Sequence, residues 1–306
     1  MSRFEVSVAF QSDEPDYDAL GMLVDAFDFD AVSVYQDLFF PPAIGPLLAL
    51  ARQVSRARVG PAALNPYTLH PVEIAGQIAQ LDTATGGRAY LGLVRGSWLD
   101  ALGLAQERPI TRLRETIEVV GYLLARQLHG YTGQHFQVDP GATLNYEPLR
   151  PAVPIVLGTW GERTARALGG LVDEIKIGGS TNPAMAERMR AWLPPHVGVC
   201  LGAVTVVDHD RAAARARARE ELRLYLPVVA KLDITLNQPN LQAHNIPDDL
   251  LDRFAFAGTP EDILRQVEAL RVAGVTRIEF GTPHGLDSPR TGLKLLGEHV
   301  LPRIER

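Results

Sequence analysis

Short apolar runs rich in β-branched residues alternate with longer amphipathic stretches along most of the chain. This alternation constrains the fold most strongly, because consecutive parallel strands need a crossover connection, which is usually a helix. We predict strands at residues 4–10, 31–36, 57–64, 88–94, 154–159, 172–179, 197–207 and 275–280. Helices are predicted at 16–28, 44–55, 71–85, 111–128, 162–170, 183–193, from the seventh strand to about residue 229, and at 291–304. This pattern favours an α/β fold, the parallel (β/α)8 TIM barrel.

An open doubly wound sheet is the competing architecture. It would place a glycine-rich nucleotide-binding turn after the first strand. Residues 11–18 read QSDEPDYD and contain no glycine, so we prefer the barrel. A small hairpin, predicted at 129–138 with its turn at Thr132 and Gly133, would be an addition to it.

The chain length and one long connection suggest the domain organisation. A length of 306 residues suits one α/β barrel, so we predict a single domain over residues 1–306. Segment 232–262 is too long for an ordinary loop. Residues 232–257 are therefore predicted to be an insertion before the eighth strand, near the barrel mouth.

The composition argues against several partners. A net charge of -6, from 36 acidic and 30 basic residues, disfavours nucleic acid and anionic membranes. The N-terminus has no hydrophobic signal core and no apolar run approaches ~20 residues, so we predict a cytoplasmic protein without membrane contact. The single cysteine, Cys200, lies in an apolar strand pattern and is expected in the core.

Side chains at the carboxyl ends of the strands carry the function of such a barrel. Most of these ends bear polar groups, aromatic groups or glycines. The candidates are Gln36 and Asp37, Ala62 to Asn65, Arg95 to Trp98, Gly158 to Gly161, Gly178 to Asn182, and Thr282 to His284. We expect them at the barrel mouth.

Two of these loops are candidate anion sites. GTWGER (158–163) and GGSTNP (178–183) each leave a strand and enter a helix, where free N–H groups and the helix dipole attract phosphate. A plain capped helix start is the alternative for each. Asp37 is likewise either a helix N-cap or a ligand-binding carboxylate, and His70 is expected to act structurally at a helix start. The sequence has no H-E-x-x-H motif, no clustered metal-ligand spacing and no nucleophile elbow, so no metal site is predicted.

Residues 59–104 carry the pattern G-P-x-x-x-N-P-Y-x-x-H-P, followed by LD, GGR and LG. The ending FAGTPEDILRQVEALRVAGVTRIEFGTPHG with GLKLLGEHVLP, together with QDLFF and GTWGE in order, extends the pattern over nearly the whole chain. The sequence resembles the bacterial luciferase-like superfamily, and within it the branch that uses the deazaflavin coenzyme F420, typified by methylenetetrahydromethanopterin reductase. The resemblance implies a TIM-type barrel with an insertion.

The resemblance also implies a cofactor site. The Ala62–Ala63 bond would be a non-prolyl cis peptide that bulges behind the deazaflavin ring, and Asp37 would lie near that ring. The remaining cofactor-binding residues would be Asn65, Arg95, Gly96, Ser97 and Trp98 around the ring, and Gly158, Thr159, Trp160, Gly161, Gly178, Gly179 and Ser180 around the phosphate.

Three departures from the family pattern bear on the substrate. Leu38 and Ser97 stand where F420-dependent glucose-6-phosphate dehydrogenases have a histidine and a glutamate, and Ser7 stands where the methanopterin reductase has a glutamate. These differences argue against a sugar phosphate and against methanopterin. The proton donor stays open among Asp37, Tyr67, His284 and Glu279, and the residues predicted to be catalytic are Asp37, Ser97 and Tyr67.

We therefore predict an oxidoreductase that transfers a hydride between F420 and a moderately hydrophobic organic small molecule, because loops 38–45 and 232–256 are apolar and carry few charges. The resemblance further implies a homodimer formed through early helices. Two alternatives stay open. One is an FMN-dependent monooxygenase of the same superfamily, which could use the same anion loops. The other is a non-catalytic flavin- or F420-binding protein, which the departures at Leu38 and Ser97 allow.

Overall fold

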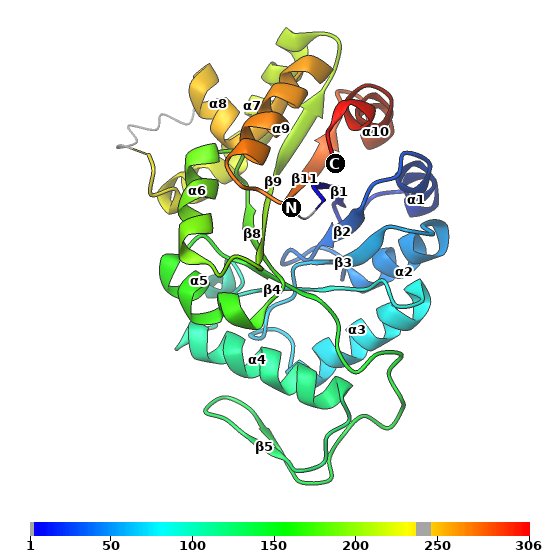
Figure 1. The fold of residues 1–306 in the computed structure, drawn as a ribbon, viewed down its shortest axis with the longest axis vertical. Helices are drawn as coiled ribbons and strands as arrows, with labels where there is room; N and C mark the ends of the chain where they lie inside the picture. The colour runs from blue at the N-terminus through cyan, green and yellow to red at the C-terminus, as the bar shows by residue number, and fades with distance from the viewer. Residues whose placement is uncertain (1–2, 237–245) are drawn as a thin grey trace.

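Parallel strands of a nearly closed sheet form the centre of the computed structural model, which describes residues 3–236 and 246–306 (Figure 1). Within these residues the barrel strands are β1 (Glu5–Phe10), β2 (Ala31–Tyr35), β3 (Arg58–Ala62), β4 (Leu91–Val94), β7 (Ile155–Gly158), β8 (Glu174–Gly178), β9 (Gly198–Val207) and β11 (Arg277–His284). They lie in the order β3-β2-β1-β11-β9-β8-β7-β4, and every neighbouring pair is parallel. Isolated bridges from Val59 to Ala89 and from Leu64 to Leu93 connect the two edges of this sheet. The predicted barrel is confirmed.

Helices connect the strands and cover the outside of the sheet (Figure 1). They are α1 (Tyr17–Ala26), α2 (Ile44–Gln53), α3 (Pro71–Thr85), α4 (Pro109–Leu124), α5 (Glu162–Leu168), α6 (Pro183–Trp192), α7 (Arg211–Leu232), α8 (Asp248–Phe254), α9 (Pro260–Val272) and α10 (Pro289–Leu295). Helix α3 begins as predicted, because His70 Nδ1 accepts the N–H of Val72 and Pro71 occupies the first turn. Among the described residues, no helix has both the length and the apolar composition needed to cross a bilayer.

The segment before the eighth strand holds more regular structure than the sequence predicts. Strand β10 (Ala255–Gly258) follows α8 and pairs in parallel with the end of β9, and a capping box formed by Thr259 and Asp262 then starts α9. Residues 237–245 of the predicted insertion lie outside the described residues. The eighth barrel strand is also shifted, because it spans Arg277–His284 rather than 275–280.

Two further local predictions need correction. The predicted hairpin forms from β5 (Tyr131–Thr132) and β6 (Gln137–Val138), but its turn lies at residues 133–136, where the N–H of Gly133 bonds the carbonyl of Phe136 at 2.8 Å. The predicted closing helix is irregular: α10 ends at Leu295, and a π-helical turn and a 3-10 turn follow it.

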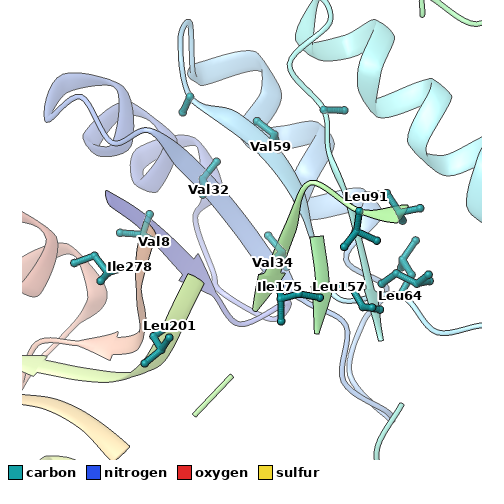
Figure 2. Packing of buried hydrophobic residues seen from close by; sticks show 14 of the residues in the cluster. Val8, Val32, Val34, Val59, Leu64, Leu91, Leu157, Ile175, Leu201 and Ile278 are labelled. Carbon is teal, nitrogen blue, oxygen red and sulfur yellow. The ribbon is translucent and has the colours of Figure 1, made fainter. Parts of the chain in front are cut away.

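The largest apolar core lies between the sheet and the helices. Successive side chains along each strand point to opposite faces of the sheet. Those of one face are apolar and belong to this core, for example Val32, Leu157 and Ile278 (Figure 2). The alternate positions face the barrel interior and include charged and hydroxyl side chains. These are Ser7, Ser33, Glu174, Lys176, Arg277 and Glu279, which bond to one another. The barrel interior is therefore an ionic network below the mouth.

Candidate active site

A cavity of about 860 Å³ opens at the carboxyl ends of the strands, which is where TIM-barrel enzymes have their active sites. Most of the predicted site residues line it: Asp37, Ala62, Ala63, Asn65, Arg95, Gly96, Ser97, Trp98, Gly158, Thr159, Trp160, Gly161 and Gly178. Tyr67, Gly179 and Ser180 are absent from the lining. Another hollow lies along the outer face of α9 and residues 303–305, away from these strand ends.

One wall of the cavity is backbone with small side chains. Pro61, Ala62 and Ala63 line it, and the Ala62–Ala63 peptide bond is cis, as the resemblance implies. Gly92, on strand β4, leaves the space that this backbone occupies, because a Cβ there would stand 1.9 Å from the Pro61 carbonyl oxygen. The wall can therefore meet a flat ligand closely.

The residues after this wall form a tight turn. Asn65 is buried, and its Oδ1 accepts the N–H groups of Tyr67 and Thr68, each at 3.1 Å. Tyr67 turns outward, where its hydroxyl donates to the Glu107 carbonyl and its ring faces the Arg112 guanidinium at 4.6 Å. Tyr67 is thus placed to brace the turn rather than to contact a ligand in the cavity.

Asp37 projects into the cavity just after β2. Burial raises the pKa of its carboxyl, and a hydrogen bond with Gln11 lowers it only in part. The N-cap alternative for Asp37 is wrong: α2 starts after Ala43, and the carbonyl oxygen that accepts the Ala43 N–H belongs to the side chain of Gln36. Asp37 is free to face a ligand.

The floor of the cavity is the ionic network of the barrel interior. Arg277, which is 1% exposed, donates from Nε to both oxygens of Glu174, at 3.1 and 3.0 Å. Lys176 pairs with Glu279, and the Ser33 hydroxyl donates to Glu279 at 2.8 Å. Burial raises the pKa of Glu279, but Lys176 and Arg277 outweigh that effect and hold it below its ordinary value.

These surroundings narrow the choice of proton donor. Glu279 is held ionised by its partners and does not line the cavity. His284 is fully buried, its Nε2 lies 3.0 Å from the Phe280 carbonyl, and burial lowers its pKa to about 4. Of the four candidates, Asp37 alone lines the cavity.

The first predicted anion loop faces the cavity. Thr159, Trp160 and Gly161 line it, and so do Arg163 and Thr164 from the first turn of α5. The indole of Trp160 donates to the Gly178 carbonyl at 3.0 Å, which ties this loop to the end of β8. The hydroxyl of Thr159 accepts the N–H of Gly161 at 3.1 Å, so this backbone N–H is not free to bind an anion. An anion in this loop would therefore be bound mainly by side chains.

The second predicted anion loop, residues 178–183, makes mainly structural contacts. The side chain of Asn182 caps α6, and its Nδ2 donates to Asp233 and Thr235, both at 2.8 Å. Gly179 has φ +78°, and a Cβ on it would stand 2.7 Å from Val229 of α7. The hydroxyl of buried Ser180 already accepts the Asn182 N–H. The loop therefore fastens the end of α7, and its polar groups are occupied, which argues against a phosphate-binding role for Gly179 and Ser180.

The charges of the lining are unbalanced toward positive. Lys176 and Arg277 are neutralised by Glu279 and Glu174. The other lining cations, Arg95, Arg108 and Arg163, form no ion pair with any described residue. Among residues 3–236 and 246–306, no group of three or more His, Cys, Asp or Glu side chains is arranged to hold a metal ion. The cavity thus suits an anionic organic ligand.

The sequence did not predict three parts of the lining, of which the first is the start of α4, with residues 108–111 and 113. Helix α7 contributes Tyr225, Val228, Val229 and Leu232, and the strands contribute Tyr35, Tyr90, Lys176 and Arg277. The signals were present. The α7 residues recur at the i, i+3, i+4 and i+7 positions of one helix face, and charged residues alternate with apolar ones in both EIKI and RIEF.

Comparison with known proteins agrees with this geometry. The luciferase-like monooxygenase family model matches residues 16–277. A 5,10-methylenetetrahydromethanopterin reductase of Archaeoglobus fulgidus is 26% identical over 292 residues, covering 85% of this chain and 86% of that protein. An F420-dependent glucose-6-phosphate dehydrogenase of Microbacterium testaceum is 26% identical over 314 residues, covering 94% and 92%. The solved coenzyme F420-dependent tetrahydromethanopterin reductase of Methanopyrus kandleri matches with a TM-score of 0.85 at 20% identity, covering 98% and 99%.

The barrel and the cavity at its carboxyl ends define a TIM-barrel enzyme. The family match spans most of the sequence. The chain belongs to the luciferase-like monooxygenase family.

Proposed function

We propose that this protein is an F420-dependent oxidoreductase that moves a hydride between bound F420 and a small, mainly apolar organic molecule. The observation that carries the proposal is the cavity. Its wall of Pro61, Ala62 and Ala63 suits a flat ring, and its mouth carries the uncompensated cations Arg95 and Arg163. The glucose-6-phosphate dehydrogenase at 26% identity and the solved reductase of Methanopyrus kandleri are both named as F420-dependent, which supports a deazaflavin over other flat cofactors.

The residues present fit this cofactor. A volume of about 860 Å³ lies near the upper end of the range, about 300–1,000 Å³, that small-molecule and cofactor sites occupy, so a flat ring of this size fits. When bound, F420 would supply the hydride chemistry itself. The protein's part is to back one face of the ring with the small-residue wall, to neutralise an anionic tail, and to exclude water.

Seven of the lining residues then have defined roles. Arg163 and Arg95 would attract the phosphate of the cofactor, with the hydroxyls of Thr159 and Thr164 as further donors. Ser97 and Trp98, in the loop after β4, would border the bound ring on that side of the cavity. Asp37 would hold the proton that accompanies the hydride, since its raised pKa increases the fraction of carboxyl that stays protonated near neutral pH.

Titration with purified F420 and with FMN, followed by fluorescence, tests the proposal. We expect F420 to bind at least about tenfold more tightly than FMN. Arg163→Ala should weaken F420 binding about tenfold, because a charge-assisted contact is lost. Arg166→Ala is the matched control on the same helix: Arg166 is exposed, pairs with Glu162 and lies outside the lining, so it should change binding less than twofold.

The same titration separates the alternatives. Tighter binding of FMN, with oxygen consumed when the bound flavin is reduced, would replace our proposal by a monooxygenase. Tight F420 binding with no hydride transfer to any ketone, alcohol or enone offered would favour the non-catalytic binding protein. The homodimer stays a prediction, which sedimentation of the purified protein would test.

A further inference from the structure

One face of helix α7 forms a continuous apolar side of the cavity. Tyr225, Val228, Val229 and Leu232 all line it, and their spacing places them on one face of the helix. Tyr225, Val228 and Leu232 remain 36%, 40% and 41% exposed, so together they form a contiguous apolar patch that faces the cavity. This face, hereafter the α7 wall, is therefore only partly covered by the described residues: Val229 packs against Gly179, and the other three side chains stay partly exposed.

The α7 wall is polar at one end only. The hydroxyl of Tyr225 forms no hydrogen bond with a described residue, and Tyr225 lines the same cavity as Asp37. Burial raises the pKa of Tyr225, and the nearby charge of Asp37 raises it further, so the phenol stays protonated and acts as a donor at neutral pH. From Tyr225 the wall then runs through Val228 to Leu232 without another polar side chain.

The wall is also held in place. At its far end Asn182 donates to Asp233 and Thr235, and Arg253 donates to Thr235 at 3.1 Å. Gly179 lets Val229 approach β8 closely. A surface fixed by buried polar contacts is suited to selecting a ligand by shape, because it does not have to be ordered on binding.

We propose that the α7 wall is the acceptor subsite, and that it selects apolar molecules with one hydrogen-bond-accepting group, such as a ketone, at the end bound by the Tyr225 hydroxyl. The inference rests on the proposed function and extends it to the substrate class. The polar group of the acceptor would lie between Tyr225 and Asp37, and its carbon chain would lie along Val228 and Leu232.

The test uses a homologous series of 2-alkanones, from 2-butanone to 2-nonanone, titrated calorimetrically into F420-loaded and cofactor-free protein. We expect the affinity to rise about two- to fourfold per added methylene, as burial of apolar surface predicts. Leu232→Ser should reduce this slope. Tyr225→Phe should instead lower the affinity about three- to tenfold at every chain length, because one hydrogen bond is lost while the slope stays.

Leu224→Ser is the matched control. Leu224 belongs to the same helix but is 73% exposed and lies outside the cavity lining, so neither slope nor affinity should change. If Leu232→Ser does not fold, Val228→Ser repeats the slope measurement. A flat series, a slope unaffected by both serine variants, or an unchanged affinity in Tyr225→Phe would each overturn the inference. Failure of F420 to bind would instead refute the proposed function, and the series in cofactor-free protein would still decide the role of the α7 wall.

Discussion

Gly92 shows how single residues set the shape of the site. Its Cα lies so close to the Pro61 carbonyl that no side chain fits between them. The resemblance predicted the cis bond at Ala62–Ala63, but the part of Gly92 could not be predicted, because it depends on a contact across two strands. For the same reason the sequence places Gly179 in a phosphate-binding loop, whereas the structure packs Val229 against it.

Gly92→Ala should therefore damage the site. The new methyl group must displace the backbone of the cavity wall, so we expect a loss of about 2–3 kcal/mol in the free energy of unfolding, measured in urea, and no detectable F420 binding. Gly121→Ala in α4 is the control. A Cβ there meets nothing within 4 Å, and removing a helical glycine should stabilise the protein by about 0.5–1 kcal/mol. Equal effects of the two substitutions would refute this explanation.

At the scale of elements, the hairpin β5–β6 supports the turn that follows the cavity wall. Phe136 of the hairpin packs edge-on against His70, and Arg112 of α4 lies over the rings of both Tyr67 and Phe136. The hairpin is in turn anchored by Glu115, whose carboxylate accepts the N–H groups of residues 134, 135 and 136. A single buried carboxylate thus links the hairpin to α4.

This anchor should make stability depend on pH. Burial raises the pKa of Glu115, but the three N–H donors outweigh it and hold the pKa below its ordinary value of about 4.3. A lowered folded-state pKa means that the stabilisation is complete well above pH 4.3 and is lost as the pH falls through the lowered value.

We expect Glu115→Gln to lower the free energy of unfolding by about 2 kcal/mol at pH 7, and by less as the pH falls below about 4. Urea unfolding at both pH values measures this. Glu118→Gln is the control. Glu118 lies one turn along, and among the described residues its side chain bonds only the hydroxyl of half-buried Tyr131, so the substitution should cost about 0.5 kcal/mol or less at either pH. A pH-independent effect at Glu115 would contradict the assignment.

The elements differ in how well the sequence predicts them. The barrel strands were predictable, because each is a short apolar run between helices. Strand β10 was not, because Ala255–Gly258 is four residues long and exists through its pairing with β9. The α7 wall was missed because α7 is polar over most of its length, and its apolar residues cluster near its end.

At the scale of the whole molecule, the fold divides its polar and apolar groups in an unusual way. Apolar side chains fill the space between sheet and helices, while the barrel interior holds the neutral ionic network of Arg277, Lys176, Glu174 and Glu279. The cavity rests on this network, is backed by β3 and is bordered by α7. That this assembly unfolds as the one domain predicted for residues 1–306 stays a prediction.

A crystal structure of the protein with F420 tests the central claim most directly. We predict the deazaflavin ring against Pro61, Ala62 and Ala63, its phosphate near Arg163 and Arg95, and open space beside the ring along the α7 wall. A ring bound elsewhere, a phosphate held by Gly179 and Ser180 with α7 displaced, or no F420 in crystals grown at saturating concentration would contradict the account.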